Sequence, residues 1–144
     1  MKLIVTTLFL ISIPYSLTPQ ECKCREPERG ATTRQGYFAS ILVEPKTRYK
    51  ELVGVVYLSD TPVEGVLVEL FPYSKDLSTG RPRLAACVTG PDGRYCFINA
   101  PKGRYEVRVS KDGGFQIIHV NVYFDPKNSK ASHAELGITL EVSY

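Results

Sequence analysis

Short runs of β-branched and aromatic residues recur from residue 51 to the end of the chain, separated by turns rich in Gly, Pro and Asp. Their spacing of about 8 to 12 residues is typical of a β-sandwich or β-barrel. No apolar period of 3.6 residues persists for three turns, so no long amphipathic helix is expected. The pattern predicts an all-β fold with strands at 51–58, 63–71, 84–89, 94–98, 104–110, 115–124 and 137–143.

Alternation within these runs separates a core face from an outer face, because successive side chains of a strand point to opposite sides of the sheet. In the run 104–110, Tyr105, Val107 and Val109 point together, while Glu106 and Arg108 point the other way. The run 115–124 is partly apolar on both parities, and we therefore expect that strand to be covered on both faces.

The first 18 residues have the layout of a secretory signal peptide. Lys2 precedes an uncharged apolar run from Leu3 to Ile13, and Pro14 and small residues follow. The run is shorter than the roughly 20 residues that span a bilayer; a buried first strand is the alternative. We expect a secreted or periplasmic protein whose mature chain has no transmembrane segment.

Three parts of the chain are expected: a signal peptide at 1–18, an N-terminal tail or linker at 19–50, and a β-sandwich at 51–144. Residues 25–36 are polar and lack an apolar period, which is typical of a linker. The segment 37–45 is apolar enough to form one extra strand.

Four cysteines in an oxidising compartment predict disulfides. Cys87 and Cys96 flank the turn 90–93 symmetrically, so we expect them to face each other across a hairpin and to be bonded. Two arrangements remain open for Cys22 and Cys24. They form a strained bond with each other, or they reach Cys87 and Cys96 and fasten the tail to the sheet.

No cofactor or metal site is predicted. Zinc favours four closely spaced ligands, and only His119 and His133 could join the cysteines. His119 lies on the more polar parity of its strand, where we expect a hydrogen-bonded structural histidine.

The segments L-V-G-V-V, T-P-V-E-G-V-L-V-E-L, T-G-P-D-G-R-Y-C-F and A-P-K-G-R-Y-E-V-R-V follow one another between Glu51 and Phe124. Pro62-Val63, Asp92-Gly93 and Gly103 are expected at their turns. This order resembles the carboxypeptidase regulatory-like domain over about half of the chain. The resemblance implies a seven-stranded transthyretin-like (prealbumin-like) β-sandwich of Greek-key type, used widely as an accessory, spacer or adhesive module. A fold does not carry a site with it.

Enzymes of the same fold are the alternative. Hydroxyisourate hydrolases end in Tyr-Arg-Gly-Ser, whereas this chain ends Glu141-Val142-Ser143-Tyr144. Intradiol dioxygenases hold ferric iron with two Tyr and two His, and the two histidines here are not a closely spaced pair. We therefore predict a non-catalytic binding or structural module.

The long loops 72–83, 99–103 and 125–136 are expected at one end of the sandwich, because connections between antiparallel strands alternate between its two ends. A net charge of +3 is too small for a nucleic-acid surface. The predicted partner is an anionic glycan, an envelope component or an acidic protein; a solvated surface without a partner is the alternative. The expected binding residues are Tyr73, Lys75, Arg81, Arg83, Lys102, Lys127 and Lys130.

Overall fold

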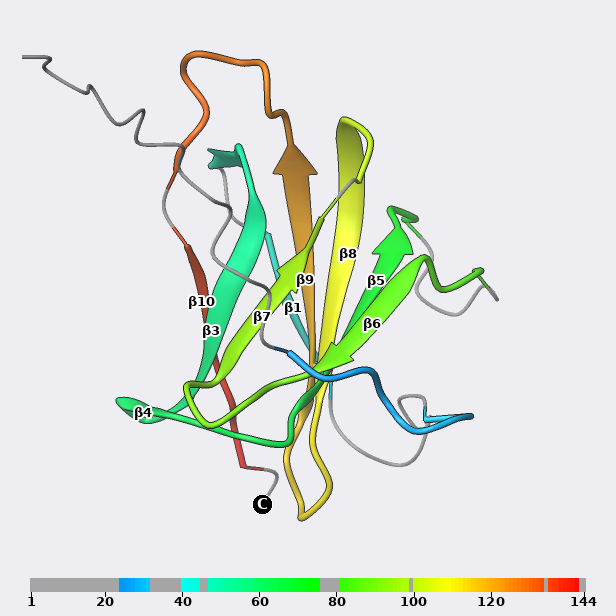
Figure 1. The fold of residues 1–144 in the computed structure, drawn as a ribbon, viewed down its shortest axis with the longest axis vertical. Helices are drawn as coiled ribbons and strands as arrows, with labels where there is room; N and C mark the ends of the chain where they lie inside the picture. The colour runs from blue at the N-terminus through cyan, green and yellow to red at the C-terminus, as the bar shows by residue number, and fades with distance from the viewer. Residues whose placement is uncertain are drawn as a thin grey trace, which may run out of the picture.

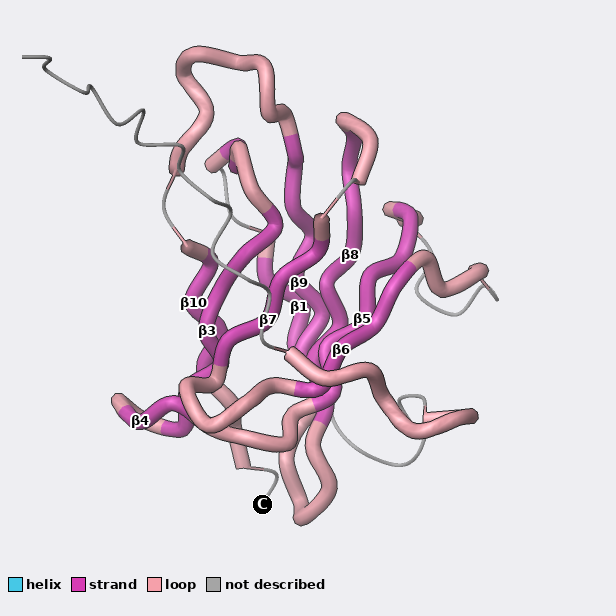
Figure 2. The backbone as a smooth tube through the Cα atoms, in the orientation of Figure 1, coloured by secondary structure: helices cyan, strands magenta, loops and turns pink. Residues whose placement is uncertain are grey.

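In the part of the chain that the structure describes, the regular structure consists of β-strands arranged in two sheets (Figure 1). The computed structural model describes residues 24–31, 40–44, 47–75, 81–98, 100–133 and 135–142. Within these ranges Figure 2 shows only strands, loops and turns, which confirms the predicted all-β class. The predicted signal peptide at 1–18 lies outside the described residues. No helix in the described ranges is long and apolar enough to cross a membrane.

The first sheet has a central antiparallel part made of β5, β8 and β9. At one edge β6 pairs antiparallel with β5, and at the other β1 and β2 both pair parallel with β9. The strands are β1 (Ser40–Val43), β2 (Arg48–Tyr49), β5 (Leu67–Pro72), β6 (Ala85–Val88), β8 (Gly103–Ser110) and β9 (Ile117–Phe124).

The second sheet is built around β3, which pairs antiparallel with β4 and β7 and parallel with β10. Its strands are β3 (Leu52–Leu58), β4 (Thr61–Pro62), β7 (Arg94–Phe97) and β10 (Leu136–Thr139). Both sheets are therefore mixed, and this arrangement does not confirm the predicted seven-stranded Greek-key topology. The extra strand expected within 37–45 is present as β1, and β2 and β4 were not predicted.

One hydrophobic core fills the space between the sheets. Val107 and Val109 of β8 have no exposed surface, as their parity predicts. The strand β9 is buried on both parities, which confirms the expectation that it is covered on both faces. Core side chains come from both sheets and include Leu52, Val56, Val68, Leu70, Tyr95, Phe97, Val107, Val109, Ile118, Val120 and Ile138.

The close contact between β3 and β10 depends on Gly54. Tyr95 passes over this glycine, and its hydroxyl donates a hydrogen bond of 3.0 Å to the Leu136 carbonyl oxygen. A Cβ at position 54 would lie 1.9 Å from that oxygen and 2.4 Å from the Tyr95 hydroxyl. A glycine in the interior of a strand often marks such a close approach.

The turn at 90–93 joins the two sheets and does not close a hairpin. The strand before it, β6, pairs with β5, whereas the strand after it, β7, pairs with β3. The reason lies in the contacts of the turn, since the Val56 amide donates a 2.9 Å hydrogen bond to the Gly93 carbonyl oxygen. This bond draws the chain onto β3 in the second sheet.

The predicted bond between Cys87 and Cys96 is therefore wrong. Cys87 is buried in the core and carries a thiol. Cys96 is disulfide-bonded, and its partner lies outside the described residues, as does Cys22. Symmetry about a turn predicts facing residues only when the two flanking strands pair with each other.

Candidate functional site

The outer face of the first sheet, which points away from the core, carries the buried charged residues Glu69, Glu106 and Arg108. Alternation along β5, β8 and β9 places polar residues on this face, and the strand register sets them side by side. Two neighbouring rows cross the three strands: Phe71, Glu106 and Asn121 in one, and Glu69, Arg108 and His119 in the other.

The carboxylate of Glu106 is the centre of this face and has no exposed surface. Arg81 donates a hydrogen bond of 3.1 Å to Oε1, and Nδ1 of His119 lies 2.9 Å from the same oxygen. Arg108 donates to Oε2 from Nε and Nη2, at 3.1 and 2.9 Å. The Arg81 and Arg108 guanidinium groups also lie over the Phe71 ring, at 5.6 and 4.1 Å from its centre. We call these five residues the Glu106 cluster.

The cluster fixes the ionisation of its carboxylate. Burial alone would raise the pKa of Glu106, but the hydrogen bond with His119, the charge of Arg108 and the hydrogen bond from Arg81 lower it to about 2. Acid–base catalysis works best with a pKa near the working pH. Glu106 therefore stays ionised at neutral pH and serves as a counter-ion for the buried cations.

We expect acid to destabilise the fold through Glu106. A carboxylate with a depressed pKa in the folded state stabilises the protein above its unfolded pKa, here near 4.5, and this stability is lost as the pH falls toward 2. The free energy of unfolding, measured by urea titration, is expected to fall by on the order of 3 kcal/mol over this window because of this group. The Glu106→Gln variant should lose that part of the pH dependence; equal pH slopes for the two proteins would contradict the assignment.

Arg81 and Arg83, two of the predicted binding residues, are used inside the fold. Arg81 is nearly buried in the Glu106 cluster and also donates a 2.6 Å hydrogen bond to the Pro72 carbonyl oxygen. Arg83 forms a 3.2 Å ion pair with the buried Glu69 and donates to the carbonyl oxygen of Ala31 at 2.5 Å. Arg81 and Nη1 of Arg83 thus bind groups of the fold itself, and the binding role predicted for these two residues stays a prediction.

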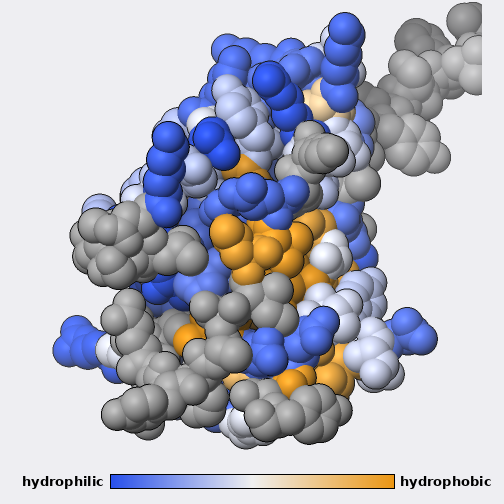
Figure 3. Space-filling model, turned by 180° about the vertical axis from the view of Figure 1, so that it is seen from behind, coloured by the Kyte–Doolittle hydropathy of each residue, from blue (hydrophilic) through white to orange (hydrophobic). Residues whose placement is uncertain are grey.

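The other predicted residues lie at the loop-rich end, around the last residues of β5 and β9 and the first of β8. Lys75, Lys127 and Lys130 are exposed. Lys102 is 60% exposed and lies 3.5 Å from the carboxylate of Asp125. In the space-filling view of Figure 3, hydrophilic side chains gather over the upper end of the molecule, where Figure 1 places the loops before β8 and after β9.

Two tyrosines and two arginines alternate across this end of the first sheet, and we call them the Tyr–Arg row. The Arg104 guanidinium lies 3.8 Å from the centre of the Tyr73 ring, and that of Arg48 lies 4.6 Å from the centre of the Tyr123 ring. Strand register places Tyr123 opposite Arg104 on one side and Arg48 on the other. Arg48 keeps 54% of its side chain exposed, and Arg104 is also exposed.

Of the Tyr–Arg row, only Tyr73 was expected from the sequence. Arg104 and Tyr123 do occupy the outward parity of predicted strands, which is a signal that the sequence contains. The sequence contains no such signal for Arg48, because this residue joins the row through the parallel pairing of β2 with β9.

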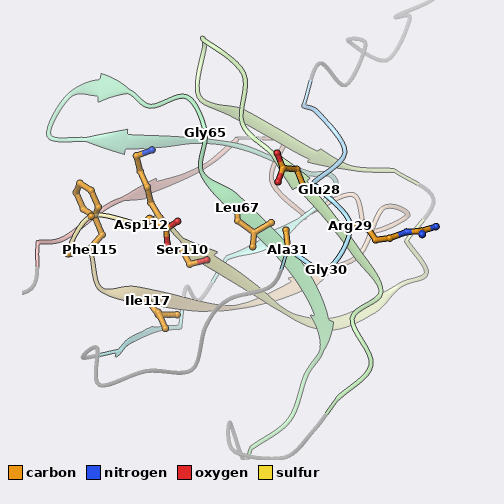
Figure 4. Close-up of a pocket in the computed structure, with 13 residues that line it drawn as sticks. Glu28, Arg29, Gly30, Ala31, Gly65, Leu67, Ser110, Asp112, Phe115 and Ile117 are labelled. Carbon is orange, nitrogen blue, oxygen red and sulfur yellow. The ribbon is translucent and has the colours of Figure 1, made fainter.

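A cavity of about 530 Å³ opens at the opposite end of the same outer face (Figure 4). Its floor contains Leu67, Ser110 and Ile117, which lie side by side on β5, β8 and β9. One wall is formed by residues 28–31 and another by the hairpin at 111–115. The cavity is thus closed partly by the N-terminal segment.

No group of three or more potential metal ligands occurs among the residues that the structure describes. Comparison with known proteins finds no matching family model, curated protein or solved structure. The resemblance to the carboxypeptidase regulatory-like domain therefore stays a prediction from the sequence.

Proposed function

We propose that this protein is a secreted, non-catalytic binding module that recognises an anionic glycan through the Tyr–Arg row. The observation that carries the proposal is the stacking of Arg104 on Tyr73 and of Arg48 on Tyr123. The N–H groups of a guanidinium lie in its plane, so stacking on a ring leaves them available to carboxylate or sulfate oxygens. The rings restrict the guanidinium groups before a ligand arrives, which lowers the entropy lost on binding.

The surroundings of the row support an anionic ligand. Lys102, Lys127 and Lys130 are exposed at the same end and add positive charge. The carboxylate of Asp125 is almost buried and lies 3.9 Å from Arg48 and 3.5 Å from Lys102, so it positions these side chains. A cluster of exposed cations attracts anions at a distance, and salt screens this attraction.

A non-catalytic role agrees with the state of the acid–base groups. The His119 ring is nearly buried and faces Glu106, whose two oxygens are already bound by cationic side chains. The signal peptide predicted at 1–18 and the resemblance to a carboxypeptidase regulatory-like module belong to the same proposal. A secreted module would meet its glycan outside the cell membrane.

Chromatography on immobilised heparin, a sulfated glycan, tests the proposal. Wild-type protein should be retained and should elute with salt. The double variant Arg48→Gln/Arg104→Gln should bind heparin about 10-fold more weakly, as expected for the loss of two charge-assisted contacts.

The matched control is Arg25→Gln/Arg29→Gln, which removes the same charge from exposed residues of the N-terminal segment. This variant should elute at a salt concentration close to that of the wild type. Equal losses in the two double variants would show attraction to net charge alone and would refute the assignment to the Tyr–Arg row. Lack of wild-type retention would refute the ligand class.

A further inference from the structure

The N-terminal segment 24–31, which we call the strap, is hydrogen-bonded to the edge of the first sheet. Arg25 and Val88 exchange two main-chain hydrogen bonds of 2.9 and 2.7 Å. Further along, the carbonyl oxygen of Ala31 accepts a hydrogen bond from Arg83, which also binds the buried Glu69. In Figure 1 the strap is the blue segment that passes the end of β6. It is therefore part of the folded domain, although it precedes the region expected to form the sandwich.

Two thiols meet where the strap touches the core. Cys24 packs against the core cluster, and its thiol is hydrogen-bonded to that of Cys87. Its sulfur also lies 3.9 Å from the carbonyl oxygen of Cys96. Because Cys96 is itself disulfide-bonded, it does not compete for either thiol.

We propose that Cys24 and Cys87 form a disulfide in the presence of a small-molecule disulfide, and that this bond fastens the strap to β6. In the first step the Cys24 thiolate attacks one sulfur of oxidised glutathione and releases one glutathione. In the second step the Cys87 sulfur, losing its proton, attacks the sulfur of Cys24 and releases the second glutathione. The protein thereby loses two electrons and two protons, and one glutathione disulfide is reduced to two thiols.

The two sulfurs differ in a way that fits this order. The hydrogen bond with Cys87 lowers the pKa of Cys24 to about 6, even though burial opposes the shift. The same hydrogen bond and burial raise the pKa of Cys87. The thiolate is the attacking form, so the partly exposed Cys24 is the entry point and the buried Cys87 is the resolving thiol.

The bond has a consequence for the cavity on the outer face. Residues 28–31 of the strap form one of its walls (Figure 4). Cys24 lies only four positions before Glu28 in the sequence. A covalent link at Cys24 therefore holds that wall against the sheet.

A non-reducing tryptic map tests the pairing directly on the full chain. The protein is reduced, oxidised with glutathione disulfide, alkylated and digested. Trypsin places each cysteine on its own peptide: one ending at Lys23, and the peptides 24–25, 84–94 and 95–102. The expected product joins 24–25 to 84–94, with a mass two hydrogens below the sum of its parts. Alkylated thiols at both positions, or a link between 24–25 and either other peptide, would overturn the proposal.

Limited trypsin digestion tests the fastening of the strap. Cleavage after Arg29 should be about 10-fold slower in the oxidised wild type than in the reduced wild type, since proteolysis follows local opening. Cys24→Ser/Cys87→Ser should cleave at the fast rate with or without glutathione disulfide. An oxidation effect of equal size in this double variant would assign the protection to another bond and overturn the role of Cys24 and Cys87.

Discussion

Replacing Glu106 by Gln is expected to lower the free energy of unfolding by about 3 to 5 kcal/mol at neutral pH, the cost typical of breaking a buried ion pair by removing one partner. Glutamine nearly preserves the shape of the side chain but removes its charge. Arg81 and Arg108, both nearly buried, would then lack their counter-ion. Urea unfolding followed by circular dichroism measures the loss.

Glu64→Gln is the matched control, because it makes the same chemical change at an exposed turn residue. The free energy of unfolding of this variant should lie within about 0.5 kcal/mol of the wild-type value. If Glu106→Gln were as mild as this control, Glu106 would not be the counter-ion of the buried arginines.

Gly54→Ala should destabilise the protein by about 3 kcal/mol, which is at the upper end of the usual cost of overpacking. The new methyl group would lie 1.9 Å from a backbone oxygen of Leu136, so β3 and β10 would have to separate. The Tyr95 hydroxyl, which binds that same oxygen, would be displaced with them. The midpoint of thermal unfolding should fall accordingly.

Gly137→Ala makes the same substitution in the neighbouring strand and serves as the control. Its Cβ would meet the Tyr57 ring at 3.4 Å, an ordinary van der Waals contact. Gly137→Ala is expected to lower the free energy of unfolding by less than about 1 kcal/mol. Equal losses at positions 54 and 137 would mean that the cost arises from strand glycines in general and not from the contact at Leu136.

Local pattern predicted the all-β class and most strand positions, because side-chain alternation and turn residues act over a few positions. It did not predict which strands pair. Cys87 and Cys96 are symmetric about their turn, yet the hydrogen bond between Val56 and Gly93 sends β7 into the other sheet. Such pairing depends on residues distant in sequence, and a local pattern does not contain it.

The candidate site was predicted only at the level of the loop-rich end. Charge and loop length predicted Arg81 and Arg83 as binding residues together with the lysines. In the structure both arginines form ion pairs with buried carboxylates, Arg81 with Glu106 and Arg83 with Glu69. The exposed arginines of the Tyr–Arg row, Arg48 and Arg104, come from strands. The parity of Glu106 and Arg108 was correct, whereas their burial was not foreseen, since it requires the loop that carries Arg81.

The parallel pairing of β1 with β9 and of β10 with β3 has a consequence for the order in which the chain folds on the ribosome. The ribosome synthesises β1 early and β9 only near the end of the chain. Until β9 is made, Leu42 and Val43 of β1 have no partner strand. Contacts between segments distant in sequence form slowly, and unpaired strand edges favour aggregation while they persist. A nascent chain of this protein should therefore depend on holding chaperones until its last quarter has emerged.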